Sequence, residues 1–537
     1  MPSYNLADLF EQVVDVVPDR VAMIAEGKHY SYRELDQRAN RLAHHLQSCG
    51  IGIGDPVGIY AFNRAEWVES LWACFKLRAV PININYRYVA EELLYIFDNA
   101  DLKMVIFERG FSPLLDAIWQ DLPLLEQALV IEDGSDDQPA VFTAPPYEEA
   151  LSRQPDRRGF GERSGDDLYM LYTGGTTGMP KGTMWRHEDI FFAALQGGNP
   201  GGEPSAAADE LAAVVLANEN PYASVCPAPI MHGGGAWYCM IFQLSGNSFV
   251  PYCKRHFDAG ELLRLVAESK ATNVIIVGDS MGRPLAEAIA TGKYDTSSLF
   301  VIGSGGAILS RSVKNELKRL LPDALIMDSF GASETGSGGM VMDIGEEAAG
   351  PRFTLSNDVA IVHEETLQPL APGSPEIGLL ARRGHIPMGY FKDEEKTAAT
   401  FKTDANGVRW VIPGDYARVL EDGTAELLGR GSVSINSGGE KIFPEEVEAA
   451  LKAHPDIYDA AVVGLPDERF GARVVAIIQT REGQTLALED VSGFCRTKIA
   501  AYKCPRELLH ADVILRTPVH KPDYRKLKAF AEANTRL

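Results

Sequence analysis

Hydrophobic and polar positions follow two patterns along most of the chain: short apolar runs and apolar residues at helical spacing. Short apolar runs at residues 57–61 and 104–107 predict buried strands, and residues 65–77 between them carry apolar side chains at helical spacing. Three later apolar runs repeat the strand pattern, at residues 273–277, 299–302 and 325–327. Strands that alternate with helices predict an α/β fold of layered, mostly parallel sheets with helices.

The pattern changes after Trp410. Residues 423–439 are irregular and rich in glycine, and a compact unit follows, with a helix expected at 444–453 and strands at 460–463 and 474–479. A chain of 537 residues is too long for one ordinary core. We therefore expect a small second domain at the C-terminal end.

Domain boundaries tend to fall in exposed, glycine-rich segments. We place a hinge near residues 430–433, which divides a large N-terminal domain (residues 1–431) from a small mobile α+β domain (residues 432–537). Two stretches rich in turn residues, 132–167 and 196–210, are predicted to be surface loops.

Charge and cysteine content limit the partners and the compartment. The formal net charge of −23 argues against nucleic acid and against an anionic membrane surface. The seven cysteines are dispersed without zinc-like spacing, which suits a reducing cytoplasm. Residues 1–11 lack the pattern of a signal peptide, and no apolar run approaches the ~18 residues of a spanning helix. We expect a cytoplasmic protein.

The most informative segment is Tyr-Thr-Gly-Gly-Thr-Thr-Gly-Met-Pro-Lys-Gly at residues 172–182. Closely spaced glycines let backbone N–H groups curl round an anion, while Thr173 and Lys181 add a hydroxyl and a positive charge. The segment differs from the GxxxxGK[ST] loop, because its lysine precedes the last glycine. It predicts a phosphate-binding loop rather than a flexible linker, with further contacts from Gly174, Gly175, Thr176, Thr177 and Gly178.

This segment resembles the phosphate loop of the acyl-adenylating superfamily, which includes acyl-CoA synthetases, stand-alone adenylation enzymes and luciferases. Other motifs follow in the family's order over nearly the whole chain. Within the superfamily, residues 83–88, 184–189 and 429–432 look like bacterial ligases for fatty acids and steroid side-chain acids. The resemblance implies that the protein uses ATP, Mg²⁺ and coenzyme A to activate a carboxylic acid through an acyl-adenylate.

The resemblance also implies an adenine site. Asp328 would accept from the exocyclic amine, Phe330 would lie against the ring, and Ser333 would contact phosphate in place of the family's threonine. Further contacts with the nucleotide or the acyl group are implied for Gly305, Gly306, Ala307, Ser329 and Gly331.

Metal and ribose contacts are implied as well. Glu334 would hold Mg²⁺, a cation that prefers carboxylate and phosphate oxygens. Asp415 would accept both ribose hydroxyls, and Arg430 would pair with the ribose or a phosphate. Taken alone, Asp415 or Arg430 is an ordinary surface charge, and the order of the motifs is what favours the functional interpretation.

By resemblance, the C-terminal domain swings between two half-reactions. Lys521 would stand beside the α-phosphate during adenylation, and Ser437, Gly438 and Gly439 would later frame the coenzyme A tunnel. At the hinge, Val433 stands where the family has Asp or Lys.

His520 is a sharper departure, because the family has glycine immediately before this lysine. If the position requires a positive φ, a non-glycine residue costs about 1–2 kcal/mol there. Two interpretations stay open: the loop tolerates His520, or adenylation is weakened. In the extreme case of the second, the protein would take an acyl-adenylate from a partner adenylating enzyme.

Residues 231–237, Met-His-Gly-Gly-Gly-Ala-Trp, correspond to the border of the family's acyl pocket. The segment has no carboxylate to bind a substrate amine, and Gly233, Gly234 and Gly235 leave room for a wide skeleton. His232 either touches the substrate carboxylate or is structural, and Trp237 is either a pocket wall or ordinary core. We predict a bulky, hydrophobic acid.

Three alternatives remain at this point. They are transfer of the acyl group to a carrier protein instead of coenzyme A, nucleotide binding without catalysis, and a luciferase-like oxygenase. The presence of Lys181, Glu334, Asp415 and Lys521 argues against a non-catalytic protein. The sequence leaves the oligomeric state open, a homodimer included.

Overall fold

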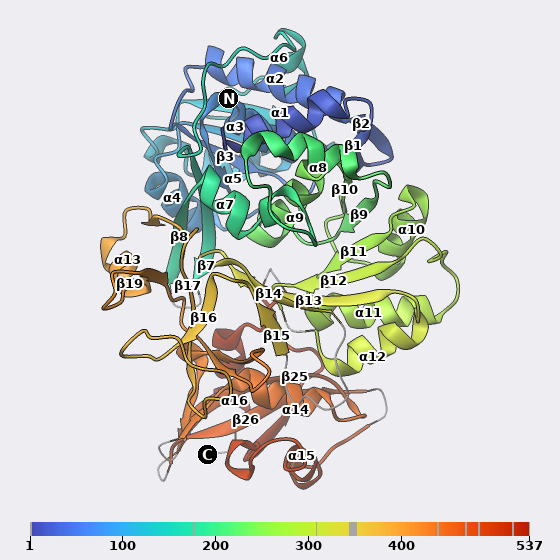
Figure 1. The fold of residues 1–537 in the computed structure, drawn as a ribbon, viewed down its shortest axis with the longest axis vertical. Coiled ribbons are helices and arrows are strands. Elements are labelled where there is room, and N and C mark those ends of the chain that lie inside the picture. Colours follow the sequence, from blue (N-terminus) through green and yellow to red (C-terminus); the bar gives the residue numbers. More distant parts are fainter. Residues whose placement is uncertain are drawn as a thin grey trace.

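The computed structural model describes residues 3–175, 178–307, 309–342, 352–437, 440–467, 470–481, 484–517 and 520–535. The C-terminal part lies at one end of the molecule, below the two large sheets and their helices, and the chain termini lie at opposite ends (Figure 1). This arrangement agrees with the predicted large N-terminal and small C-terminal domains.

One large sheet has seven strands among the described residues, in the order β18-β8-β7-β4-β3-β5-β6. Its centre, from β7 to β6, is parallel, while β8 and β18 extend it in antiparallel fashion. The strands are β3 (Pro56–Tyr60), β4 (Val80–Asn83), β5 (Met104–Glu108), β6 (Gln127–Ile131), β7 (Leu168–Gly175), β8 (Gly178–Arg186) and β18 (Gly389–Tyr390).

The second large sheet contains a parallel run, β13-β12-β11-β9-β10-β1, and an antiparallel extension at each end. The parallel strands are β1 (Val21–Ala25), β9 (Ala223–Cys226), β10 (Ser248–Pro251), β11 (Asn273–Ile276), β12 (Val301–Gly305) and β13 (Leu325–Ala332). The antiparallel ones are β2 (Lys28–Ser31), β14 (Gly336–Met342), β15 (Arg352–Leu355), β16 (Val359–Val362), β17 (Gly378–Arg382), β19 (Phe401–Thr403), β20 (Arg409–Val411), β21 (Asp415–Val419) and β22 (Ala425–Arg430).

Helices cover these sheets, and local sequence explains where several begin. Ser31 and Glu34 form a reciprocal capping box at α2, and the Asn5 side chain caps α1. The helices are α1 (Leu6–Val16), α2 (Tyr32–Ser48), α3 (Ala65–Leu77), α4 (Ala90–Asn99), α5 (Ser112–Asp116), α6 (Tyr147–Ser152), α7 (His187–Ala193), α8 (Leu211–Ala217), α9 (Gly233–Leu244), α10 (Ala259–Ser269), α11 (Gly278–Ala290), α12 (Arg311–Leu320), α13 (Glu394–Thr400), α14 (Pro444–Lys452), α15 (Leu488–Cys495) and α16 (Tyr524–Asn534).

The C-terminal part pairs its strands only with one another in the described residues. They are β23 (Ile435–Ser437) and β24 (Glu440–Ile442) in one hairpin, and β25 (Ile457–Asp467), β26 (Gly471–Thr480) and β27 (Glu507–His510) in a three-stranded sheet. Helices α14 and α16 contact β25. The helix and both strands expected here from the sequence are confirmed.

Among the other local predictions, the helix at 65–77 is confirmed and the two surface loops are wrong in part. The helix predicted at 65–77 is α3, with the same bounds. The stretch 132–167, expected as a loop, contains the helix α6. The start of the second expected loop, at Gly197 and Gly198, is buried rather than exposed, because Pro204, Leu211 and Phe191 pack against it.

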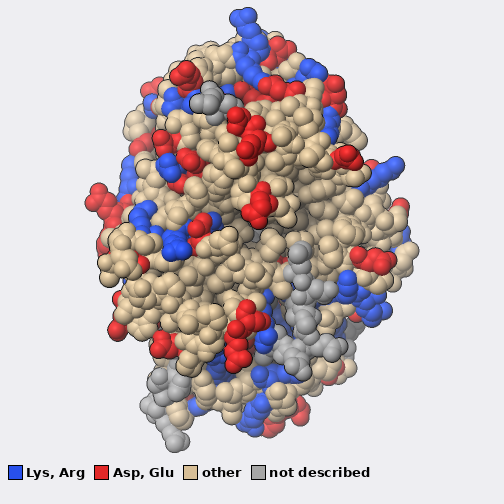
Figure 2. Space-filling view, in the orientation of Figure 1, with Lys and Arg blue, Asp and Glu red and all other residues tan. Residues whose placement is uncertain are grey.

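Figure 2 shows acidic and basic side chains interspersed over the visible face. Across the described ranges, no helix is both long and apolar enough to span a membrane.

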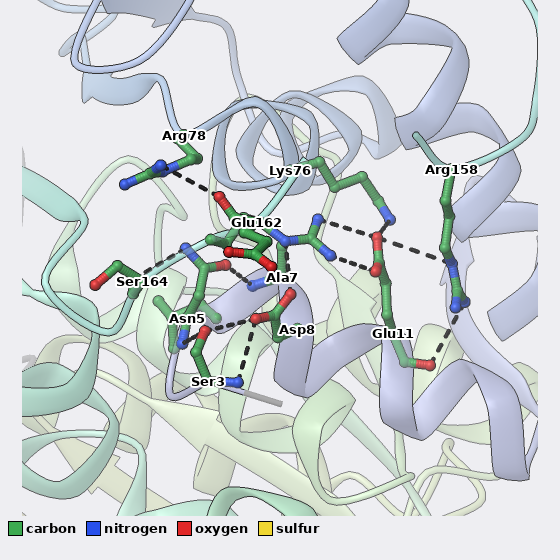
Figure 3. Close-up of polar contacts among 12 residues, drawn as sticks. Ser3, Asn5, Ala7, Asp8, Glu11, Lys76, Arg78, Arg158, Glu162 and Ser164 are labelled. Carbon is green, nitrogen blue, oxygen red and sulfur yellow. Dashed lines mark hydrogen bonds and ion pairs between the residues drawn. The ribbon is translucent and has the colours of Figure 1, made fainter. Parts of the chain in front are cut away.

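A buried ion network ties α1 and α3 to the loop before β7 (Figure 3), and Asp36 adds α2 to it. Lys76 is fully buried, and its Nζ lies 2.5 Å from Glu11 and 2.6 Å from Asp36. Arg163 pairs with Glu11 and, at 2.6 Å, with Asp8. The opposite charges compensate for the loss of hydration, so each member depends on the others.

This network predicts a stability that depends on acid pH. Burial disfavours the charged form of Glu11, but Lys76 and Arg163 outweigh it and lower the pKa of Glu11 from 4.5 to about 2. The resulting stabilisation, about 3 kcal/mol, is complete above pH 4.5 and is lost as the pH falls toward 2. Urea unfolding should show that Glu11→Gln loses less stability than wild type between pH 6 and 3.5. The exposed control Glu91→Gln should behave like wild type, and equal slopes in all three proteins would contradict the assignment.

Candidate active site

The motifs from distant parts of the chain meet at one cavity of about 1680 Å³. The N-terminal part contributes Thr173, the segment from Ser304 to Ala307 and Asp415, and the C-terminal part contributes Thr517 and Lys521. Its position at the carboxyl ends of parallel strands of both sheets is where α/β proteins usually bind ligands. The candidate active site therefore lies between the two parts of the molecule.

The predicted phosphate loop joins β7 to β8 as an antiparallel hairpin, with Thr173 opposite Lys181 and Gly175 opposite Gly178. Thr176 and Thr177 lie outside the described residues, and the predicted contacts of Gly174, Gly175 and Gly178 stay predictions. Thr173 lines the cavity. Lys181 does not line it, because its Nζ lies 2.9 Å from Asp393 and 5.7 Å from the Tyr390 ring centroid.

Asn83 is a site residue whose role was missed from the sequence. Its Oδ1 accepts from the Tyr172 backbone N–H at 2.8 Å, and its Nδ2 donates to the Tyr172 carbonyl at 2.8 Å and to the Met231 carbonyl at 2.7 Å. One side chain thus fixes the start of the phosphate hairpin against the segment that precedes α9. Asn83 is the last residue of β4, and nothing around it in the sequence indicates these contacts.

Three charged side chains surround Lys521. Asp415 and Arg430 stand opposite each other on β21 and β22, and Arg430 Nε donates to Asp415 Oδ1 at 2.9 Å. Lys521 is exposed to the cavity but enclosed by protein, and this burial is the main cause that lowers its pKa. Arg430 lowers the pKa further, while Asp415 and Glu334 raise it. The structure therefore brings together Lys521, Asp415, Arg430 and Glu334, as predicted.

Glu334 is held by a tyrosine from the other large sheet. The Tyr390 hydroxyl donates to Glu334 Oε1 at 2.9 Å, and burial followed by the Glu334 charge raises the pKa of Tyr390. The buried Arg382 donates to the carbonyls of Thr335 and Ser337, at 3.0 and 2.8 Å. Glu334 is thus oriented by its own hydrogen bond and by a fixed backbone, and sequence reasoning missed both Tyr390 and Arg382.

Asp328 has a partner that the sequence did not suggest. Its Oδ2 lies 2.8 Å from Lys314 Nζ on α12, and both side chains are buried. Burial raises the pKa of Asp328 to about 6, against the lowering effect of Lys314. Asp328 lines the cavity, so the predicted contact with adenine would be made by a carboxylate already paired with a cation.

Residues at the end of β13 and directly after it line the cavity. Phe330 covers Gly338 and Gly339 of β14, where an added Cβ would lie 2.3 and 2.9 Å from its ring. Ser329 Oγ donates to the Ser304 carbonyl at 2.9 Å, and the Ser333 carbonyl accepts from Trp185 at 2.9 Å. The other predicted contacts also line the cavity, namely Gly305, Gly306, Ala307 and Gly331.

The three glycines at the start of α9 have different surroundings. An added Cβ at Gly234 would meet nothing within 4 Å, whereas one at Gly235 would lie 2.4 Å from the Pro229 carbonyl oxygen and one at Gly233 would lie 2.8 Å from Leu171 Cδ2. Only Gly234 leaves open space, as predicted for all three. Gly233 and Gly235 are required for packing.

His232 and Trp237 both line the cavity. The Nε2 atom of His232 is buried and has no hydrogen-bond partner among the described residues. Burial is the main cause that lowers the pKa of His232 to about 3, with Lys521 and Arg87 adding to the effect. His232 is therefore neutral, and its unpaired nitrogen favours the interpretation that it contacts a ligand.

The lysine loop is attached to the C-terminal sheet. Arg516 donates to the His520 carbonyl at 2.7 Å and to Asp459 Oδ2 on β25 at 2.6 Å. His520 has a φ of 60°, as anticipated for a position where the family has glycine. Ser437 is buried and does not line the cavity, and Gly438 and Gly439 lie outside the described residues.

The overall structure has the fold of a solved adenylate-forming enzyme. It matches the crystal structure of the anthranilate CoA ligase AuaEII in complex with anthranoyl-AMP with a TM-score of 0.84, at 22% identity over 99% of this chain and 98% of that one.

The AMP-binding enzyme family matches residues 10–391, and its C-terminal domain matches residues 446–521. The chain is 46% identical to 3-oxocholest-4-en-26-oate–CoA ligase of Rhodococcus rhodochrous, over 98% of this chain and 95% of the relative. It is 44% identical to a medium/long-chain-fatty-acid–CoA/3-oxocholest-4-en-26-oate–CoA ligase of Mycobacterium tuberculosis, over 98% and 96%. The chain belongs to the AMP-binding enzyme family and is an ATP-dependent, AMP-forming ligase, which confirms the resemblance.

Proposed function

We propose that this enzyme activates a bulky, hydrophobic carboxylic acid, of the long-chain or steroid side-chain kind, and transfers it to coenzyme A. The observation that carries the proposal is the single cavity in which Lys521 faces Asp415, Arg430 and the phosphate hairpin, beside a wide apolar region under α9. The named relatives act on acids of these kinds.

The chemistry proceeds in two steps. A carboxylate oxygen attacks the α-phosphorus of ATP, the bond to the pyrophosphate group breaks, and an acyl-adenylate forms. The coenzyme A thiol, once it has lost its proton, then attacks the acyl carbon and displaces AMP. The protein contributes position and charge: Lys521 beside the α-phosphate, backbone N–H groups of the hairpin, and Asp415 at the ribose.

Glu334 fits the role of a magnesium ligand. Tyr390 occupies its Oε1, and Oε2 has no hydrogen bond among the described residues. Mg²⁺ in nucleotide sites is commonly held by one or two carboxylates together with substrate phosphates. When bound, the ion would neutralise phosphate charge, and Glu334 would fix its position.

We also propose that residues 432–537 rotate between the two half-reactions, which would bring Ser437 toward the cavity in the second.

The seven cysteines are all free, which supports our expectation of a reducing cytoplasm.

A substrate panel tests the proposal, with pyrophosphate release and thioester formation measured separately. Long-chain fatty acids and steroid side-chain acids should be the best substrates, and acetate and benzoate should be poor. A best substrate among the small acids would refute the proposed acid class. A requirement for a carrier protein in place of coenzyme A would refute the proposed acceptor. The relatives do not favour the carrier-protein alternative. They also do not favour an oxygenase or a ligase limited to the second half-reaction.

His520→Gly is expected to raise the rate of adenylation about tenfold. The positive φ of His520 costs a non-glycine residue about 1–2 kcal/mol in the state in which Lys521 lies in the cavity. Glycine removes that cost, so this state becomes more populated. The measurement compares ATP-dependent pyrophosphate release with thioester formation from synthetic acyl-AMP.

The control is Lys270→Gly, at the end of α10. Lys270 also has a positive φ, 50°, but lies outside the cavity, so its replacement should leave adenylation unchanged. If His520→Gly changes both half-reactions by the same factor, the backbone of His520 does not limit adenylation.

A further inference from the structure

One face of the second large sheet forms the floor of the cavity on the acyl side. In β11, β12 and β13, Ile275 stands beside Gly303 and Gly303 beside Met327, and all three line the cavity. Residues two apart on a strand point to the same face. The floor therefore continues from Gly305 at the nucleotide end to Val301, about 13 Å away at a strand rise of ~3.3 Å per residue.

Helix α9 forms the roof. Tyr238, Ile241 and Phe242 of this helix line the cavity and recur at helical spacing. The Tyr238 hydroxyl lies 3.3 Å from Ser329 Oγ at the nucleotide end, and the Phe242 ring lies 6.0 Å from the Tyr222 ring at the other end. Floor and roof thus enclose an apolar channel that leads away from the nucleotide.

In the middle of the channel, the floor is formed by the Gly303 backbone and the Ile275 side chain that packs on it. An added Cβ at Gly303 would lie 2.8 Å from Ile275 Cδ1, so glycine is required here for packing.

The far end of the channel is polar, in contrast to its middle. Thr272 Oγ1 donates to Asn273 Oδ1 at 2.9 Å, which leaves the Asn273 amide nitrogen as a donor. In the part of the chain that the structure describes, neither this nitrogen nor the Tyr222 hydroxyl has a hydrogen-bond partner, and both residues line the cavity. Two donors therefore face the position of the substrate's remote end.

We infer that the preferred acid carries a hydrogen-bond acceptor, a keto or hydroxyl oxygen, at the end of its skeleton opposite the carboxyl group, and that Asn273 and Tyr222 bind it. The inference rests on the proposed function, which places the carboxyl group near Lys521. A plain hydrocarbon end would cover both donors without replacing their hydrogen bonds to water, which is unfavourable. The exposed Phe300, also in the cavity wall, shows that this end lies near the surface.

The test uses a matched pair of acids: a steroid acid with its carboxyl group on the side chain and a keto group at the far ring, and the same skeleton without that oxygen. Wild type should favour the keto acid about tenfold in kcat/KM for AMP formation. Asn273→Leu and Tyr222→Phe should each reduce this preference to about threefold or less, by slowing the keto acid alone.

Two internal controls accompany the assay. The deoxy acid should keep its kcat/KM in both variants, which reports that they fold and catalyse normally. Phe300→Leu changes an apolar residue at the same end and should keep the wild-type preference. Equal use of both acids by wild type, or a preference that survives Asn273→Leu and Tyr222→Phe, would overturn the inference alone. Adenylation of neither acid would overturn the proposed function as well.

Discussion

Lys521→Ala is expected to lower acid-dependent pyrophosphate release by about 10²–10³-fold, the usual effect of removing one group that stabilises developing charge. The structure supports this size, because Lys521 lines the cavity together with Asp415 and Arg430 and interacts electrostatically with both of them and with Glu334. Thioester formation from synthetic acyl-AMP and coenzyme A should change little, since the α-phosphate has already been attacked.

The pH profile supplies a second readout for Lys521. Burial lowers the pKa of Lys521, so its ammonium form is lost at lower pH than that of an ordinary lysine. Adenylation by wild type should therefore decline on the alkaline side, and Lys521→Ala should lack that decline. Lys526→Ala, which removes the same charge from an exposed site on α16, serves as the control and should retain full activity. An equal loss in both half-reactions would contradict the assigned role.

Glu334→Gln is expected to lower adenylation about 10²-fold and to raise the Mg²⁺ concentration needed for half-maximal rate. The amide keeps the shape of the side chain and can still accept from Tyr390, but it no longer carries the negative charge that holds the cation. The measurement is pyrophosphate release against free Mg²⁺ concentration at saturating ATP.

A second tyrosine–glutamate pair offers a matched control. Glu364 accepts from the Tyr416 hydroxyl at 2.9 Å, and Glu364 itself does not line the cavity. Glu364→Gln should leave the Mg²⁺ dependence unchanged. If Glu334→Gln is slow but has the wild-type Mg²⁺ dependence, Glu334 acts by a route other than metal binding.

Much of the fold could be predicted because local signals agreed with tertiary packing. Helix α3 is apolar around most of its circumference and lies between two buried strands, so residues 65–77 had one consistent interpretation. The antiparallel extensions of both sheets were harder to foresee, because short strands such as β18 and β20 depend on distant partners for their pairing.

Some residues of the candidate site could likewise be predicted from the sequence, and others could not. Residues in contiguous motifs, such as Thr173, Asp415 and Lys521, were predicted because each motif carries its own chemistry. Asn83 and Tyr390 were not, because their partners lie 89 and 56 residues away and nothing in their neighbourhood indicates the contact. The sequence also gives no sign that Gly235 packs against the Pro229 carbonyl.

The double hydrogen bond of Arg516 has a mechanical consequence. One guanidinium group joins the His520 carbonyl to Asp459 on β25, so the loop before Lys521 is braced against the small sheet. In the proposed rotation of residues 432–537, Lys521 would therefore move together with the small sheet. Arg516→Met removes both hydrogen bonds. It should therefore leave Lys521 misplaced in the cavity, while the proposed rotation of residues 432–537 itself continues.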